Sequence, residues 1–350
     1  MEKLFLLDAY ALIYRAYYAF IKNPRINSKG FNTSAILGFI NTLEDVLKKE
    51  NPTHIGIAFD PKGPTFRHEA YEQYKAQREE TPEVIRESVP VIKEFIRAYN
   101  IPIFEVSGYE ADDVIGTLAK QAEKRGIITY MMTPDKDYGQ LVSETTFIYR
   151  PKYGDKEFEV MGADRVKEKF GIENTMQVID LLGLMGDSSD NIPGCPGVGE
   201  KTAQKLIAQF GSIENLLEKT SELKGALKTK VEENKEKILF SKFLATIKTD
   251  VPIELNMDSL KRETPDEEKL TALLDFYELR SLKERVKKTN FAPSLFDDTP
   301  QPTTTQRPTD KKEKKQDALQ GSLFDFFPTD YTGEEKKSSH LTLKEVQHTY

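Results

Sequence analysis

The sequence predicts an α/β core with a mainly parallel sheet over residues 1–170, followed by an all-α domain over residues 171–290. Three observations carry this prediction. Short apolar runs alternate with helical patterns in the first part, which is typical of a parallel sheet covered on both faces. Short helical patterns separated by Gly and Pro fill the second part. From residue 291 the composition shifts to Pro, Thr, Lys, Asp and Gln.

Four strands are expected at residues 3–7, 54–59, 101–106 and 127–132, where aliphatic and aromatic residues follow one another almost without interruption. Apolar residues at helical spacing predict helices at 34–49 and 111–125. Thr33 or Ser34 is suited to cap the first of these helices, and Gly126 ends the second. In the following domain, helices are expected near 176–185, 200–210, 212–219, 230–245 and 266–288.

The end of the chain has a different composition. Residues 291–340 have few aliphatic side chains and are expected to be a disordered linker, because they cannot bury enough apolar surface to offset the entropy of ordering. Residues 341–350 regain an ordered-looking pattern, so we expect them to be the start of a truncated downstream domain.

Composition favours a cytoplasmic protein. The single cysteine, Cys195, excludes an internal disulfide and a thiolate metal cage, and it fits a reducing compartment. No apolar run approaches the roughly 20 residues that a membrane span needs. The apolar start of the chain ends at Asp8, which is too early for a signal peptide.

The net charge of −7, from 50 Lys and Arg against 57 Asp and Glu, argues at first against a nucleic-acid partner. Nine of the acids, however, are expected to form one cluster. Without them 57 − 9 = 48 acids face 50 bases, a balance of +2. An acidic total can therefore accompany a neutral or basic binding surface.

Acidic residues follow all four predicted strands. They are Asp8, Asp60, the group Glu110, Asp112 and Asp113, and the pair Asp135 and Asp137. Each of them alone is more simply explained as a helix cap or a turn residue. Four successive strands that end in acid at the same edge favour a shared site, because ligands bind at the carboxyl edge of parallel strands.

Such an acidic cluster predicts divalent cations. Carboxylates packed together repel one another and raise each other's pKa, which bound cations relieve. Hard oxygen ligands without Cys or nearby His favour Mg²⁺, for which Mn²⁺ can substitute, over zinc. Mg²⁺ keeps several waters, so seven acids suggest two ions. Two ions about 4 Å apart are the arrangement with which two-metal enzymes hydrolyse phosphodiester bonds.

A loop in the second domain adds Asp187 and Asp190 to the acids. A calcium-binding loop that starts at Asp187 is excluded, because Ile192 stands where Gly is needed and Val198 where Glu is needed. A Walker A loop is excluded because Glu200 interrupts the motif. What remains is a pair of helices joined by a Gly-rich hairpin.

The hairpin is a candidate phosphate site. Gly197 and Gly199 let backbone N–H groups approach a phosphate at the start of the next helix, and Lys201 and Lys205 extend that contact. A plain turn between two helices explains the same segment equally well.

Residues 66–78 interleave basic and aromatic side chains, namely Arg67, Lys75 and Arg78 with Tyr71 and Tyr74. This combination suits a nucleic-acid backbone with unstacked bases, although a solvated helix face is the simpler explanation without the neighbouring acids. Arg15, seven residues after Asp8, is expected to point into the same crevice.

Five motifs in order resemble the flap-endonuclease family, whose members include the 5′-nuclease domain of bacterial DNA polymerase I. They are LLD (6–8), AFD (58–60) followed by FRHE (66–69), GYEADD (108–113), TPDKD (133–137) and GDSSDNIPGCPGVGEKT (186–202). The resemblance covers roughly residues 1–290. One departure is Ser34, where many members have Gly before Ala, and it leaves the acids untouched.

The resemblance implies a PIN-like nuclease core and a helix–hairpin–helix domain that grips duplex DNA. It implies an enzyme that removes RNA primers and displaced 5′ flaps with two Mg²⁺ ions in replication and repair. It also implies that the chain is the N-terminal part of a polymerase, with a K⁺ ion at the hairpin.

By motif position, the resemblance also assigns roles to the residues. One ion would be held by Asp8, Asp60, Glu110 and Asp112, the other by Asp135, Asp137 and Asp187, with Asp113 and Asp190 as the extra acids of bacterial members. Lys75 and Arg78 match a basic pair that steadies the scissile phosphate, and Tyr74 matches the adjacent aromatic.

Residues 320–324 are similar to the short peptide by which bacterial replication proteins bind the sliding clamp, with Gln320, Leu323 and Phe324 as its key side chains. A chance match is the alternative. The expected partners are therefore DNA and the clamp, with the chain a monomer. Two rival functions stay open: a non-catalytic DNA-binding module with structural metal ions, and a nucleotide hydrolase that uses the Gly-rich turn.

Overall fold

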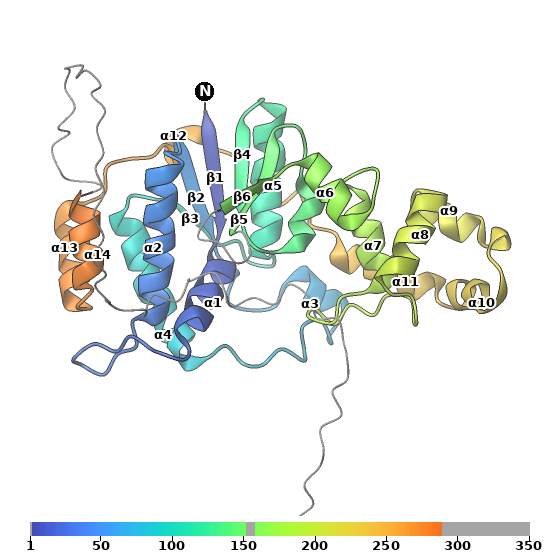
Figure 1. Ribbon diagram of the computed structural model, residues 1–350, viewed down its shortest axis with the longest axis horizontal. Helices are drawn as coiled ribbons and strands as arrows, with labels where there is room; N and C mark the ends of the chain where they lie inside the picture. The colour runs from blue at the N-terminus through green and yellow to red at the C-terminus, as the bar shows by residue number, and fades with distance from the viewer. Residues whose placement is uncertain (1, 152–157, 289–350) are drawn as a thin grey trace, which may run out of the picture.

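The computed structural model describes residues 2–151 and 158–288 (Figure 1). Its centre is a six-stranded sheet in the order β3-β2-β1-β4-β5-β6. The strands are β1 (Lys3–Asp8), β2 (His54–Ala58), β3 (Ile103–Phe104), β4 (Ile128–Met132), β5 (Thr146–Pro151) and β6 (Phe158–Met161). All neighbours pair in parallel except β5 and β6, which are antiparallel. The predicted mainly parallel sheet is confirmed.

Helices cover both faces of the sheet, as the apolar strands require. Side chains of β1 alternate between the faces: Leu4 and Leu6 pack in the cluster that contains α5 (Ala111–Lys124), whereas Phe5 and Leu7 pack with α1 (Ala9–Phe20), α2 (Ser34–Lys49) and α4 (Glu83–Ala98). Figure 1 shows α5 on one side of the strands and α2 with α4 on the other. The carboxyl ends of the strands are therefore left for the loops that carry the acids.

Several elements of the core were not predicted from the sequence. Helix α1 contains four tyrosines, and α4 contains Pro90, so both are rich in poor helix formers. Strand β6 is the last strand of the sheet and β5 pairs with it, and both carry polar residues that break the apolar run. The third strand is shorter than expected, since only Ile103–Phe104 pairs with β2.

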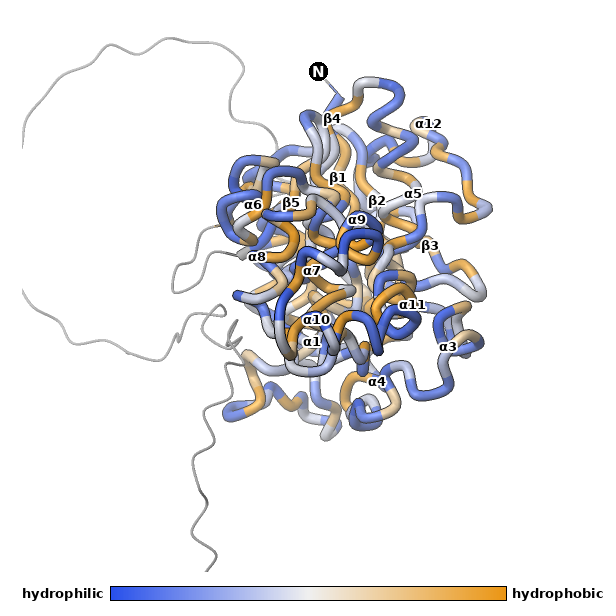
Figure 2. Tube along the Cα trace, turned by 90° about the vertical axis from the view of Figure 1, so that its right-hand side faces the viewer, coloured by the Kyte–Doolittle hydropathy of each residue, from blue (hydrophilic) through white to orange (hydrophobic). Residues whose placement is uncertain are grey.

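The helical part follows as α6 (Ala163–Phe170), α7 (Gln177–Met185), α8 (Glu200–Phe210), α9 (Ile213–Glu218), α10 (Gly225–Glu233) and α11 (Lys235–Ala245). The predicted helix 230–245 is in fact two helices that meet at Asn234. Helix α7 packs between α8 and α11. Figure 2 shows the apolar runs of this part, and its buried side chains form one cluster with the α5 face of the sheet.

The last helices return to the core. The predicted helix 266–288 is broken at Glu278, a residue with a positive φ of 59°, into α13 (Glu267–Phe276) and α14 (Arg280–Val286). Their side chains Leu270, Leu274, Leu282 and Val286 pack with α2 and α4, so this segment packs on the core and not with α7–α11 as we expected. The short α12 (Met257–Leu260) precedes them beside β2.

Among residues 2–151 and 158–288, no helix is both long enough and apolar enough to cross a membrane. The expected linker at 291–340, the expected domain start at 341–350 and the clamp-like peptide lie outside the described residues.

Candidate active site

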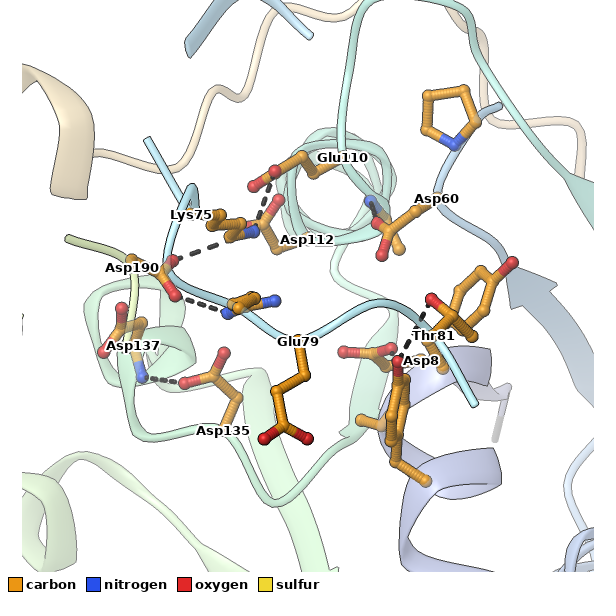
Figure 3. A pocket seen from close by; sticks show the side chains of 16 residues that line it. Asp8, Asp60, Lys75, Glu79, Thr81, Glu110, Asp112, Asp135, Asp137 and Asp190 are labelled. Carbon is orange, nitrogen blue, oxygen red and sulfur yellow. Dashed lines mark hydrogen bonds and ion pairs between the residues drawn. The ribbon is translucent and has the colours of Figure 1, made fainter. Parts of the chain in front are cut away.

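A cavity of about 470 Å³ opens at the carboxyl ends of β1, β2 and β4 (Figure 3). Seven of the nine predicted acids line it: Asp8, Asp60, Glu110, Asp112, Asp135, Asp137 and Asp190. They come from four strand ends and from the loop after α7, so segments separated by more than 180 positions meet here. Asp113 and Asp187 do not line the cavity.

Asp8 and Asp60 are held by backbone N–H groups at the starts of helices. Asp8 caps α1, because its Oδ1 accepts a hydrogen bond from the Ala11 N–H at 3.2 Å, and its Oδ2 accepts from Tyr138 Oη at 3.2 Å. Oδ1 of Asp60 accepts from the Ala111 N–H, the first of α5, at 2.7 Å. Burial, together with repulsion from Asp60, raises the pKa of Asp8 to about 7, and burial also raises the pKa of Asp60.

Glu110 and Asp112 lie at the start of α5, and their surroundings shift their pKa values in opposite directions. Glu110 accepts from Lys75 Nζ at 2.8 Å and from Tyr74 Oη at 3.0 Å. Burial alone would raise the pKa of Glu110, but Lys75 and Arg67 outweigh it and hold that pKa below its usual range. For Asp112, burial and the adjacent Asp113 raise the pKa well above the ordinary value.

Asp113, a predicted metal ligand, lies outside the cavity lining. Its side chain is 0% exposed and both oxygens are occupied. Arg67 donates to Oδ1 and Oδ2 at 2.8 Å each, and the N–H groups of Glu110 and Lys248 donate at 3.0 and 2.8 Å. The carboxylate is therefore an internal structural anion, turned away from the cavity.

Arg67 is for the same reason not the DNA contact that we expected. It is 1% exposed. Besides Asp113, it donates to the carbonyl oxygens of Leu244 and Thr246 at 2.9 Å each, where α11 ends. Arg67 thus joins α3 (Phe66–Ala70), α5 and α11.

The segment after α3 crosses the mouth of the cavity. Within residues 66–78 only α3 is helical, and turns follow it. Lys75 has a positive φ of 56°, and its backbone N–H donates to the carbonyl of Asp190 at 3.0 Å. The side chains of Lys75 and Arg78 both line the cavity, and that of Arg78 is 52% exposed.

Tyr74 and Arg15 are placed differently from our expectation. Tyr74 is buried, with its hydroxyl 3.0 Å from Glu110 and 3.1 Å from Asp190, so its ring is not available for stacking on a base. Arg15 is buried in α1 and is not among the residues that line the cavity. Burial lowers the pKa of Arg15 to about 10.

Asp135 and Asp137 begin the short 3₁₀ helix η1 (Lys136–Leu141). Oδ1 of Asp135 accepts the Asp137 N–H at 2.9 Å. In contrast, Oδ1 of Asp137 is buried without a hydrogen-bond partner. Desolvation by the surrounding protein raises the pKa of both groups, and for Asp137 the neighbouring Asp135 and Asp187 raise it further.

Cationic side chains neutralise the two acids of the loop after α7. Asp190 pairs with Arg78 and lies 3.7 Å from Lys75 Nζ (Figure 3). Asp187 pairs with Lys136 at 3.0 Å. Burial alone would raise the pKa of Asp187, but Lys136 and hydrogen bonds from Ser189 keep that pKa below its usual value.

The oxygen atoms that line the cavity are suited to binding divalent cations, but the carboxylates do not converge on one point. In residues 2–151 and 158–288, no three His, Cys, Asp or Glu side chains are close enough to hold an ion. Lysine and arginine side chains lie between several of the acids. Nevertheless all the candidate donors are hard oxygens, and the unpartnered oxygen of Asp137 is open to a cation.

The Gly-rich hairpin has an exposed, basic tip. Gly197 has a positive φ of 76°, and a Cβ there would lie 2.5 Å from Lys230 Nζ. Gly199 precedes α8 and has open space around it. Lys201 and Lys205 are exposed on the first turns of α8. All four predicted hairpin residues thus lie at a surface that a phosphate can reach.

Some residues of the site were not found from the sequence. The cavity is also lined by Tyr10, Tyr14, Glu79 and Thr81, and Lys136 lies beside it. The spacing of Tyr10 and Tyr14, four residues apart after a strand-end acid, is the signal that places both rings on one face of α1. Glu79 and Thr81 carry no such signal, because the turns that place them are irregular.

Family models match most of the described chain. One, described as the 5′-3′ exonuclease N-terminal resolvase-like domain, matches residues 3–171, and the 5′-3′ exonuclease C-terminal SAM fold matches 174–268. The 5′-3′ exonuclease of Aquifex aeolicus is 38% identical over 288 residues, which is 82% of this chain and 96% of that protein. DNA polymerase I of Bacillus subtilis is 45% identical over 81% of this chain.

The chain spans about a third of the length of the polymerase relatives, 32% in the case of Bacillus subtilis. Among solved structures, the T5 D15 flap endonuclease in a complex with DNA and metal ions has a TM-score of 0.59 and 19% identity. The match covers 79% of this chain and 100% of that one. It confirms the predicted order of an α/β core and an all-helical unit.

Proposed function

The chain belongs to the 5′-3′ exonuclease family, and from this premise we propose that it hydrolyses nucleic acid at free or displaced 5′ ends with two Mg²⁺ ions. The single observation that carries the proposal is the cavity in which seven carboxylates meet beside Lys75 and Arg78. A site that only bound DNA would gain nothing from so many mutually repelling acids.

The residues of the cavity have distinct tasks in this proposal. Lys75 and Arg78 lie on the segment that crosses the cavity, where their positive charges would bind the scissile phosphate and orient it over the acids. The carboxylates lining the cavity would hold the ions, for which Mn²⁺ can substitute. Cations bound there supply the charge that lowers the pKa of the attacking water and stabilises the leaving oxygen.

The bond that breaks lies between phosphorus and O3′. The released piece then ends in a 3′-hydroxyl and the remaining strand begins with a 5′-phosphate. Asp8 is suited to binding a cation because neighbouring acids repel its carboxylate, and a bound ion would relieve that repulsion.

The hairpin supplies the grip on duplex DNA. Gly197 and Gly199 expose backbone N–H groups at the start of α8, where the helix dipole favours a phosphate, and Lys201 and Lys205 extend the basic surface. A K⁺ ion at the hairpin belongs to this proposal. So does a substrate with a 5′ flap, a nick or an RNA primer, as in replication and repair.

The relation to longer proteins is part of the proposal as well. Relatives of this chain include DNA polymerase I, so the activity would serve as the 5′-nuclease of a polymerase that acts on cytoplasmic DNA. We expect a monomer. The proposed clamp peptide with Gln320, Leu323 and Phe324 lies outside the described residues, and unchanged clamp affinity after Leu323→Ala and Phe324→Ala would remove that part.

A 5′-labelled flap duplex tests the proposal. Product should form with Mg²⁺, and none should form with EDTA. Asp60→Ala and Asp135→Ala should abolish cleavage while duplex binding survives, because both side chains line the cavity and neither lies at the hairpin. Asp258→Asn, an exposed acid on α12, is the matched control and should cleave normally.

The other functions predict different results in the same assay. A non-catalytic module would bind the flap and yield no product at any Mg²⁺ concentration. A nucleotide hydrolase would turn over ATP, but Glu200 still interrupts the phosphate-binding spacing. Near-normal cleavage by Asp60→Ala or Asp135→Ala would contradict the assignment of the site.

A further inference from the structure

Lys136 has no role in the proposed reaction, and in the sequence it lies between two acids that line the cavity. It follows Asp135 and precedes Asp137 at the start of η1. Its Nζ lies 3.0 Å from Oδ2 of Asp187, an acid from a loop 51 positions away. The Lys136 side chain is 42% exposed, whereas that of Asp187 is 7% exposed.

The ammonium group pairs with one carboxylate, and the charges of two others act on it. Asp187, Asp137 and Asp135 all stabilise the charged form of Lys136, in that order, and they outweigh the cost of its burial. The same three acids repel one another, since Asp187 raises the pKa of both Asp135 and Asp137. The ammonium group thus lies where a cation is needed to hold these acids together.

Asp187 is oriented independently of Lys136. Its Oδ1 accepts from the backbone N–H of Ser189 at 2.7 Å and from the Ser189 hydroxyl at 2.5 Å. The backbone of Asp187 is fixed by a two-bond bridge to Ile192, at 2.9 and 2.8 Å. Only Oδ2 faces Lys136, so that oxygen would stay in place if Lys136 moved away.

We propose that Lys136 occupies a cation position on the Asp187 side of the cavity, and that a divalent ion binds to Asp187 only after displacing Lys136 from it. The inference rests on the proposed function, because it presumes that divalent ions bind these acids. Lys136 is a positioning residue here: it keeps the metal-free acids together and lowers the affinity for the ion that replaces it.

The geometry makes this displacement easy. Lys136 is long, flexible and partly exposed, so its ammonium can return to water at small cost. Lys75 is different, because its own backbone N–H is bonded to Asp190 and its side chain is only 19% exposed. Removal of Lys136 therefore isolates the competition at Asp187.

Calorimetric titration with Mn²⁺ in the absence of DNA tests the inference. Wild type should show a weaker class of sites that Asp187→Asn removes. Lys136→Met should bind Mn²⁺ at this class about fivefold more tightly, the factor that corresponds to one partly exposed ion pair. Lys136→Arg keeps the charge and should bind as weakly as wild type.

Each outcome decides something. Equal affinities for wild type and Lys136→Met, with Asp187→Asn still removing the weaker class, would overturn the inference and leave the proposed function standing. Absence of any Mn²⁺ binding by wild type would overturn both.

A measurement on the unchanged Lys136 covers the case in which Lys136→Met does not fold. After ¹³C-dimethylation of the lysines, the Lys136 signal, assigned from Lys136→Arg, should shift as Mg²⁺ saturates the weaker sites. A signal that stays constant throughout that titration would refute the displacement.

Discussion

Replacement of Arg67 should lower the free energy of unfolding far more than the loss of a surface cation would. The guanidinium is 1% exposed and makes hydrogen bonds to two carboxylates and two backbone carbonyls. In Arg67→Met, Asp113 would remain as a buried and unpaired anion. Breaking a buried pair in this way costs about 3–5 kcal/mol. A domain of ordinary stability has about 5–15 kcal/mol in total.

Urea unfolding followed by circular dichroism measures the effect. Arg67→Met should lower the free energy of unfolding by about 3 kcal/mol or more, whereas removal of a solvent-exposed cation that binds DNA would change it by about 0.5 kcal/mol or less. The double variant Arg67→Met/Asp113→Leu should recover part of the loss, because the unpaired charge is then absent. Lys201→Met is the matched control at an exposed cation.

A loss below about 1 kcal/mol in Arg67→Met would refute the reasoning, since a fully buried guanidinium cannot be removed so cheaply. A double variant no more stable than Arg67→Met would show that the Asp113 charge is not the source of the loss. The first result would show that the contact between α3, α5 and α11 does not depend on Arg67.

Three further predictions follow from the site. The pKa of Asp8 is about 7 in the fold against 3.8 in the unfolded chain, so between these pH values the metal-free fold binds one more proton than the unfolded chain. With EDTA present, the free energy of unfolding should therefore fall as pH rises from 4 to 7. Asp8→Asn should flatten that fall, as measured by thermal melts at several pH values. Gly194→Ala should cost about 1–3 kcal/mol in urea unfolding, because φ is +60° and the new Cβ would lie 2.4 Å from a backbone nitrogen, whereas Gly199→Ala has open space and should cost little. The double variant Lys201→Glu/Lys205→Glu should weaken duplex binding. The slope of log affinity against log salt concentration should become shallower by about one for each phosphate that the lysines no longer neutralise. Fluorescence anisotropy at several salt concentrations measures both effects.

The fold was predictable where one physical pattern dominated. Buried parallel strands need apolar side chains on both faces, so β1, β2 and β4 were found within a residue or two. Helix α4 was missed because Pro90 lowers helix propensity, although in the folded chain the apolar face around it is buried. The position of α13 and α14 on α2 and α4 is a tertiary contact, for which local periodicity carries no information.

The location of the site was predictable from the sequence, but the ion pairs within it were not. Acids at strand ends must gather at one edge of a parallel sheet, and six of the seven do, joined by Asp190 from the loop after α7. Which acid meets which cation depends on partners far apart in sequence, such as Lys136 with Asp187 and Arg67 with Asp113. Sequence spacing cannot show these pairs, because they arise from loops whose path is set only after the core packs.

Asp112 and Asp113 illustrate why adjacent acids in one motif acquire different roles. Consecutive residues on a helix point about 100° apart, so a helix that begins at the edge of the cavity can turn only one of the two toward it. Asp112 lines the cavity, whereas Asp113 points inward and, as the third residue of α5, also accepts the Glu110 N–H in a capping box. Asp113→Asn should therefore lower stability, while Asp112→Asn should spare stability and impair Mn²⁺ binding; the reverse result in urea unfolding and calorimetry would contradict this division.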